Sequence, residues 1–259
     1  MYIDSHCHLD RLDLSAYNNA LQPVLDAAAA RDVSRMLCVA IDMQQFPAMY
    51  AAIQQLPNVY ASVGVHPLHM EQGLVEIDQL LHYAADPKVV ALGETGLDYF
   101  YQQDTIALQQ ESFIRHLKAS ALCRLPVIVH TRDAQEDTIS LLRQHADQDV
   151  GGVLHCFTES WAMAQQALEL NYMLSFSGII TFRNAAELRE VVKKVPLDSL
   201  LIETDAPYLT PVPYRGKPNE PQYVVEVAQC VADIKGLSVE EVACVTSANF
   251  ERLFPKAAL

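Results

Sequence analysis

Eight short apolar segments alternate with longer segments of helical character along the chain. Continuous apolar, β-branched runs of this kind are typical of strands that are buried on both faces, as in a parallel sheet whose strands are joined by helices. The expected strands are residues 2–7, 36–41, 60–65, 89–93, 127–130, 152–155, 173–177 and 200–204. The expected helices are residues 20–31, 46–55, 77–85, 106–123, 134–145, 161–170, 184–194, 223–235 and 238–254.

The spacing of these segments favours an α/β fold of the (β/α)8 TIM barrel type. Division of the 259 residues by eight strands gives about 32 residues for each unit, close to the ~30 residues that a strand-helix-strand unit needs. The alternative is an open doubly wound sheet, although no GxGxxG or GxxxxGK[ST] loop follows any expected strand. No linker or repeat divides the chain, so we expect one domain over residues 1–259.

The sequence carries no recognisable leader and no run of about 18 apolar residues, so we expect a cytoplasmic protein that does not associate with membranes. No obligate protein partner is indicated. Six cysteines without a CxxC pair predict free thiols, and for Cys7 and Cys156 we favour packing over metal binding.

A formal net charge of -14 argues against a broad basic surface for nucleic acid. A small cationic pocket is still compatible with that charge. Salt screens charges that are more than roughly 8 Å apart, so bound metal ions dominate the electrostatic field inside a pocket even when the distant surface is acidic.

Two histidines, His6 and His8, lie one residue apart in the first expected strand. Since side chains alternate along a strand, both project to one side, as does Asp4, and both imidazoles can reach one ion. A pair of structural histidines is the alternative, and residues further along the chain make it less attractive.

Four more ligand-type residues close later strands. Glu94, His130, His155 and Asp205 each stand at the carboxyl end of an apolar run. In a TIM barrel these ends converge on one face, where active sites are built. We therefore expect one site that contains all six side chains.

Four histidines and two carboxylates suit Zn, Mn, Fe or similar divalent ions. A single catalytic zinc takes three protein ligands, so six ligands predict two ions for each chain, with Mg, Mn or Zn as the main candidates. Glu94 lies midway in the set and is the expected bridging carboxylate. Such ions give a nucleophilic water at neutral pH and clamp an oxygen of a phosphodiester. Asp205 is our candidate general base, and a purely ligating role is the alternative.

Seven motifs resemble those of the TatD family of metal-dependent hydrolases. They are DSHCHL (4–9), GVHP (64–67), GETGLDY (93–99), HTRDA (130–134), HCFT (155–158), SGIITF (177–182) and ETDAPYLTP (203–211). The resemblance implies an amidohydrolase-like barrel with deoxyribonuclease activity. It also implies that His6, His8, Glu94 and Asp205 hold one ion and that Glu94, His130 and His155 hold the other. Glu159 departs from the usual HCF[ST]GS, and the lost glycine puts the family's substrate preference in doubt.

Further residues are candidates for substrate binding. His66 closes the third expected strand and is placed to contact a phosphate, or else to cap the strand end. Arg132 offers a bidentate fork for phosphate, or else a surface salt bridge. Candidates for stacking and polar contacts to nucleotides are Tyr99, Tyr208, Arg215 and Asn219. The histidines outside the site are expected to be solvated; they are His69, His82, His116 and His145.

We expect a deoxyribonuclease whose partner is DNA or another nucleic acid, taken from ends or as single strands because the surface is acidic. The alternative from another class is a hydrolase of small amides, lactones or esters, including aminoacyl esters on transfer RNA, on the same dinuclear site. A metal-binding structural protein without turnover is a third possibility.

Overall fold

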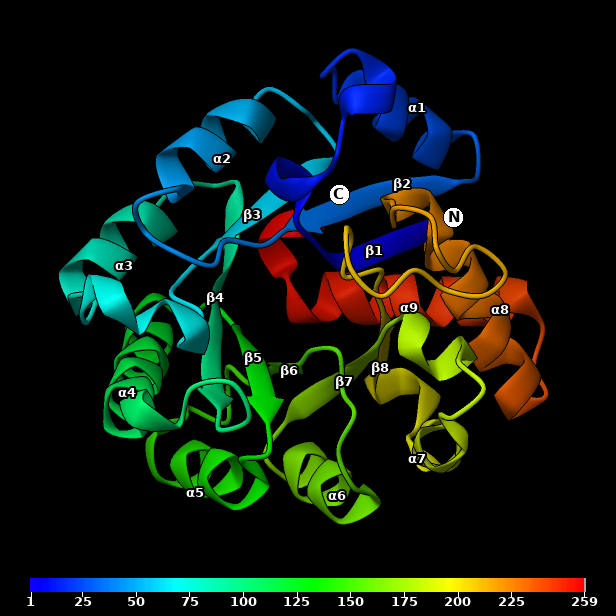
Figure 1. Cartoon of the computed structure of the whole chain (residues 1–259). Helices are drawn as coiled ribbons and strands as arrows, with labels where there is room; N and C mark the ends of the chain where they lie inside the picture. The colour runs from blue at the N-terminus through cyan, green and yellow to red at the C-terminus, as the bar shows by residue number, and fades with distance from the viewer. Residues whose placement is uncertain (259) are drawn as a thin grey trace.

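The computed structural model describes residues 1–258 and shows eight parallel strands around a central axis, with helices outside them (Figure 1). The strands are β1 (Tyr2–Cys7), β2 (Val33–Cys38), β3 (Val59–Val63), β4 (Val89–Asp98), β5 (Val127–Arg132), β6 (Gly152–Leu154), β7 (Tyr172–Phe176) and β8 (Leu200–Ile202). The helices are α1 (Gln22–Ala29), α2 (Phe46–Ile53), α3 (Ile77–Ala84), α4 (Ile106–Cys123), α5 (Gln135–His145), α6 (Trp161–Glu169), α7 (Ala186–Lys194), α8 (Val224–Lys235) and α9 (Val239–Leu253).

Each strand pairs in parallel with the next one along the chain, in the order β1 to β8. Hydrogen bonds beyond the strand ends then join the last strand to the first. The N–H of Asp205 donates to the carbonyl of His6 at 2.9 Å, and the N–H of His8 donates to the carbonyl of Ala206 at 2.7 Å. The side chain of Asp4 accepts a 2.8 Å hydrogen bond from the N–H of Thr204. The sheet is therefore a nearly closed barrel, and the open doubly wound alternative is wrong.

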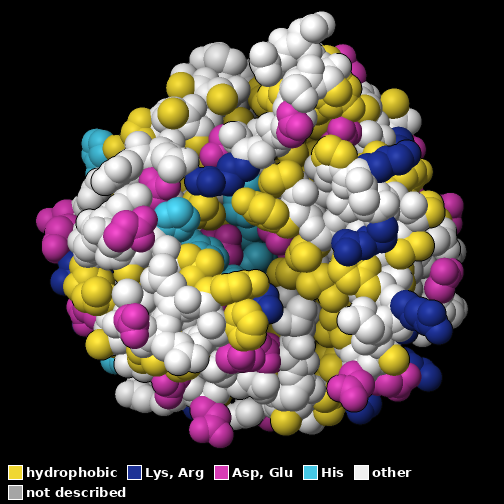
Figure 2. Space-filling view, viewed as in Figure 1, with side chains coloured by type: hydrophobic (Ala, Val, Ile, Leu, Met, Phe, Trp, Pro, Cys, Tyr) yellow, Lys and Arg dark blue, Asp and Glu magenta, His cyan; other side chains and the backbone are white. Residues whose placement is uncertain are grey.

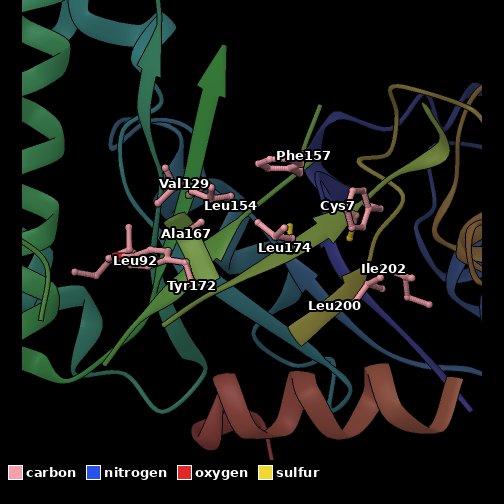
Figure 3. Packing of buried hydrophobic residues seen from close by; sticks show 14 of the residues in the cluster. Cys7, Leu92, Val129, Leu154, Phe157, Ala167, Tyr172, Leu174, Leu200 and Ile202 are labelled. Carbon is pink, nitrogen blue, oxygen red and sulfur yellow. The ribbon is translucent and has the colours of Figure 1, made fainter. Parts of the chain in front are cut away.

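The main hydrophobic core lies between the strands and the surrounding helices. Val129, Leu154, Leu174 and Leu200 are register partners on β5 to β8, and each is fully buried. Figure 3 shows this part of the cluster, in which side chains from neighbouring strands lie next to one another. Burial on both faces explains why the strands are continuous apolar runs in the sequence.

A second apolar cluster closes the end of the barrel at which the strands begin. Val90, Ile128, Val153 and Leu201 are each the second residue of a strand, and they cluster with Phe250 of α9. The last helix thus lies across this end (Figure 1). The opposite end, where the strands finish, is left for polar residues.

Two strands differ from the sequence-based bounds by three residues or more at an end, and the other differences are of one or two residues. β2 begins at Val33, three residues before the expected start, and β4 continues to Asp98 instead of ending at residue 93. Gly93 lets β4 continue because its φ is +122° and an added Cβ would lie 2.5 Å from the carbonyl oxygen of Ile128. A larger side chain cannot occupy that position without moving the backbone.

His116 is buried and does not lie in solvent, so the expectation that it is solvated was wrong. Its side chain is 0% exposed on α4. Its Nδ1–H donates to the carbonyl of Ser112 at 2.8 Å, and its Nε2 accepts from the N–H of Val65 at 3.1 Å. His116 therefore joins α4 to the backbone that carries His66. Burial lowers the pKa of His116 to about 4.

Replacement of His116 by Gln should flatten the pH dependence of stability. The folded-state pKa lies below the unfolded value of 6.5, so the unfolded chain binds one more proton between about pH 4 and 6.5. In the parent this stabilisation is complete above pH 6.5 and is lost as pH falls toward 4, an effect of about 3 kcal/mol. Denaturant unfolding of the chelated protein at several pH values measures it. The exposed His82→Gln is the control, and a His116→Gln variant with the parent's full pH slope would contradict the assignment.

Within residues 1–258, no helix has both the length and the apolar character that a membrane crossing requires.

Candidate metal centre

Five ligand-type side chains line a cavity of about 460 Å³ at the end of the barrel where the strands finish; they are His8, Glu94, His130, His155 and Asp205. His6 is buried behind them, with its Nε2 3.4 Å from Oε2 of Glu94. Figure 2 shows histidines at the bottom of this hollow, with basic and hydrophobic side chains along its edge. The structure brings together all six residues that sequence analysis assigned to the site; they are His6, His8, Glu94, His130, His155 and Asp205.

Glu94 lies at the centre of the group, and its two carboxylate oxygens face different partners. Oε2 lies 3.4 Å from Nε2 of His6 and 3.9 Å from Nε2 of His8. Oε1 lies 3.2 Å from Nδ1 of His130 and 2.7 Å from Nε2 of His155. Asp205 completes the first group, since its Oδ1 lies 3.4 Å from Nε2 of His8. The donors therefore divide into two sets that share one carboxylate.

Three of the histidines point one ring nitrogen toward Glu94 or Asp205. Their other ring nitrogen donates a hydrogen bond to an acceptor behind the site. Nδ1 of His8 donates to the carbonyl of Val39 at 2.9 Å. Nε2 of His130 donates to Oδ2 of Asp98 at 3.0 Å. This arrangement fixes the tautomer and turns the other nitrogen, with its free lone pair, toward Glu94 or Asp205, as in protein metal sites.

His155 has the same arrangement. Its Nδ1 lies 3.3 Å from Oε1 of Glu203, which is fully buried and also accepts from the N–H of Cys156 at 2.8 Å. Among residues 1–258, Nε2 of His155 has no hydrogen-bond partner of acceptable geometry, despite its short distance to Glu94. Nε2 atoms of His6 and His8 also lie only 3.3 Å apart. Buried nitrogens and oxygens that converge in this way fit a set of metal ligands.

Electrostatics in the cavity also suit cations. Burial opposes ionisation of Glu94, but His155 and His66 lower its pKa well below the ordinary value. Burial likewise opposes protonation of His155, yet Glu94 and Glu203 raise its pKa well above that of a free histidine. Burial opposes ionisation of Asp205 too, and His8 and His6 lower its pKa. Divalent ions supply the positive charge that balances these ionised carboxylates.

The chain matches the family model described as TatD related DNase over residues 3–255. The chain belongs to the TatD family. It is 50% identical over 252 residues to the uncharacterized metal-dependent hydrolase YcfH of Escherichia coli (strain K12), covering 97% of this chain and 95% of the relative. It is 40% identical over 258 residues to the uncharacterized metal-dependent hydrolase YabD of Bacillus subtilis (strain 168), covering 98% and 99%.

Solved structures agree with this membership. The TatD homologue YJJV of Escherichia coli k12 superposes with a TM-score of 0.91 at 32% identity, covering 98% of both chains. An organophosphorus hydrolase from Deinococcus radiodurans superposes with a TM-score of 0.68 at 15% identity, covering 98% of this chain and 92% of that one. The second likeness shows the shared barrel alone.

Three of the TatD-motif residues expected to contact substrate line the cavity. Nε2 of His66 lies 3.2 Å from Oε1 of Glu94, so this histidine is as close to the carboxylate as His130 is. Arg132 and Tyr208 lie at the edge of the cavity, and Tyr208 is 51% exposed. Sequence analysis placed His66 near a phosphate but did not anticipate its contact with Glu94.

The other three expected contacts lie elsewhere. Asn219 is 0% exposed, and its Nδ2 donates to the carbonyls of Thr204 and Tyr208, so it supports the loop and is closed to substrate. The hydroxyl of Tyr99 donates to Asp137 at 2.7 Å, outside the cavity. Arg215 packs 4.0 Å from the ring centroid of Phe182 and is also not among the residues that line the cavity.

Two carboxylates were missed, although the sequence held a signal for each. Asp98 is four residues after Glu94 on the same strand, so alternation puts it on the side of Glu94. Glu203 stands two residues before Asp205 in the same motif, just beyond the end of β8. Glu159, noted as a departure from the family motif, lies beside Asp133, and burial together with that neighbour raises its pKa.

Proposed function

We propose that this chain is a metal-dependent deoxyribonuclease that hydrolyses phosphodiester bonds in single strands or at ends, with two divalent ions. Mg, Mn and Zn are the candidate ions. The first ion would be held by His6, His8, Glu94 and Asp205, and the second by Glu94, His130 and His155, with His66 beside the second set.

The observation that carries the proposal is the division of the donors by the two oxygens of Glu94. Nitrogens of His6 and His8 lie nearest Oε2, and those of His66, His130 and His155 lie nearest Oε1. A carboxylate placed between two sets of imidazole nitrogens is the arrangement of a shared bridge. The description of the matching family as a DNase supports the choice of substrate.

Bound divalent ions supply a nucleophilic water at neutral pH and neutralise charge on a phosphodiester. The chain's own groups do the rest. Asp205 is ionised and lies at the open side of the first set, where it accepts the proton of the attacking water. Arg132 and Arg11 at the cavity edge bind phosphate oxygens outside the metal sets.

A preference for ends or single strands is supported by charge and by shape. The chain has a formal net charge of -14, and the donors lie at the bottom of a cavity of about 460 Å³. A cavity of that size contacts few phosphates, so binding should depend only weakly on salt. The net negative charge of the chain repels the phosphates of a long duplex.

Metal analysis combined with a substrate panel tests the function. We expect exhaustive chelation to abolish hydrolysis and added Mn or Mg to restore it, because all six donors surround the reacting position. The panel comprises single-stranded DNA, covalently closed duplex, RNA, bis(p-nitrophenyl) phosphate, a lactone and an aminoacyl ester. Single-stranded DNA should be the best macromolecular substrate, with a shallow salt dependence.

Other outcomes of that panel are informative. Activity that survives complete metal removal would disprove the metal-dependent mechanism. Rapid nicking of closed duplex would contradict the preference for ends. Turnover of the lactone or the aminoacyl ester without cleavage of DNA would establish the alternative, in which the same cavity polarises a carbonyl. Metal binding without turnover of any substrate would leave a structural role.

A further inference from the structure

Two aromatic side chains directly after β4 are exposed to solvent. Phe100 is 52% exposed and Tyr101 is 61% exposed, and their rings pack edge to face, with centroids 4.7 Å apart and planes at 88°. A pair of adjacent exposed aromatic rings is a candidate interaction surface.

The rings are ordered against a cation at the edge of the cavity. The guanidinium carbon of Arg132 lies 4.4 Å from the ring centroid of Phe100 and 4.9 Å from that of Tyr101. Tyr101 and Arg132 both line the cavity that contains Glu94 and His130. An aromatic surface and a phosphate-binding cation thus lie side by side at the edge of the metal centre.

The carboxylate of Asp98 hydrogen-bonds both to the backbone of this aromatic pair and to a histidine of the metal centre. Oδ1 of Asp98 accepts from the N–H groups of Phe100 at 3.1 Å and Tyr101 at 2.8 Å, while Oδ2 accepts from His130. Gln109 of α4 bonds both the N–H and the carbonyl of Asp98, at 2.8 and 3.2 Å. The aromatic pair is therefore fixed in position relative to the donors around Glu94.

We propose that the ring of Tyr101, held edge to face by Phe100, forms a stacking platform for an unpaired nucleobase next to the phosphate that is cleaved, with Arg132 on that phosphate. The proposal rests on the proposed nuclease function and narrows its substrate to DNA whose terminal bases are unpaired. An unpaired base is the occupant that the observations favour, because the platform joins an exposed π-surface to a cation within one cavity. A base inside a duplex has both faces covered by its neighbours and cannot stack on this ring.

The test compares the parent with the double variant Phe100→Ala, Tyr101→Ala on single-stranded oligonucleotides that carry either a normal or an abasic residue at the 3′ or the 5′ end. We expect the variant to raise KM for the normal oligonucleotide by about tenfold to a hundredfold, as the loss of one stacked base predicts. On one of the two abasic substrates the parent and the variant should be equal. Fluorescence of 2-aminopurine at that end should be quenched on mixing with the parent and much less with the variant.

Controls separate this inference from the function on which it rests. Metal content and the folded circular dichroism spectrum should match the parent, and Leu122→Ala, which removes an exposed side chain of α4 outside the cavity, should change nothing. The single variants Phe100→Leu and Tyr101→Leu serve if the double variant misfolds. A parent that cleaves no DNA defeats the proposed function. A parent that cleaves DNA while the variant loses equally on normal and abasic ends, or loses nothing, overturns the platform alone.

Discussion

Replacement of Glu94 by Gln should remove most hydrolytic activity and at least one equivalent of bound metal. The variant keeps the size of the side chain but loses the charge that lies between the two sets of nitrogen donors. Two cations close together repel strongly in a partly desolvated cavity, so a neutral bridge lowers the occupancy of at least one. We expect the rate to fall by more than the ~10–100-fold that is typical when an outer partner of a metal ligand is lost.

The fold should survive this change, because the core around the barrel is apolar. The thermal unfolding midpoint in chelator should stay within about 4 °C of the parent, the shift that 1 kcal/mol produces in a chain of this size. The exposed Glu187→Gln on α7 is the matched control for loss of a carboxylate charge. Full metal content and parental turnover in the Glu94 variant would show that the carboxylate bridges nothing.

Asp205→Asn should have an effect of similar size through a different mechanism. Burial opposes ionisation of Asp205, but His8 and His6 lower its pKa, so the side chain stays charged across the neutral range. Loss of a general base costs about 10²–10⁴-fold in rate. Because hydroxide can replace a missing base, the rate of the variant should rise with pH more steeply than that of the parent.

Added metal distinguishes the two roles of Asp205. If Asp205 serves only as a ligand, its replacement lowers the rate by lowering the metal occupancy, so excess Mn would restore the parental rate. A proton acceptor leaves a defect that excess Mn does not repair, and this is the result we expect. Measurement of rate against metal concentration at pH 6 to 9 gives the answer, with the exposed Asp149→Asn as control. Complete rescue by metal would assign the purely ligating role.

The strands could be predicted because each is an apolar run of its own. β1 and β8 begin at the expected residues, and α4 has the expected bounds at both ends. Burial on both faces makes such runs continuous, which a reader of the sequence can recognise. The predicted strand at residues 89–93 ended too early because glycines at 93 and 96 look like strand ends. In the barrel these glycines let β4 pass close to β5.

The roles of Asn219 and His116 could not be predicted in the same way. Both are polar residues of ordinary sequence context, yet both are 0% exposed and satisfy backbone groups from distant segments. Nothing local marks a side chain as the partner of a backbone N–H that lies 51 residues away, as His116 is of Val65. Solvent exposure depends on how the whole molecule packs, and for polar residues the sequence pattern predicts it poorly.

The sequence by itself determined the barrel and the six side chains that meet at one end of it, because strand patterns and strand ends are local properties and a parallel barrel brings all its strand ends to one face. The family followed from the resemblance of seven motifs. Only the tertiary structure decided how those side chains divide around Glu94, that Asp98 and Glu203 hold His130 and His155 from outside, and that Phe100 and Tyr101 remain uncovered beside them. These features depend on distances between residues on different strands and on which surface stays open to solvent, and both are fixed only when the helices pack and the barrel closes.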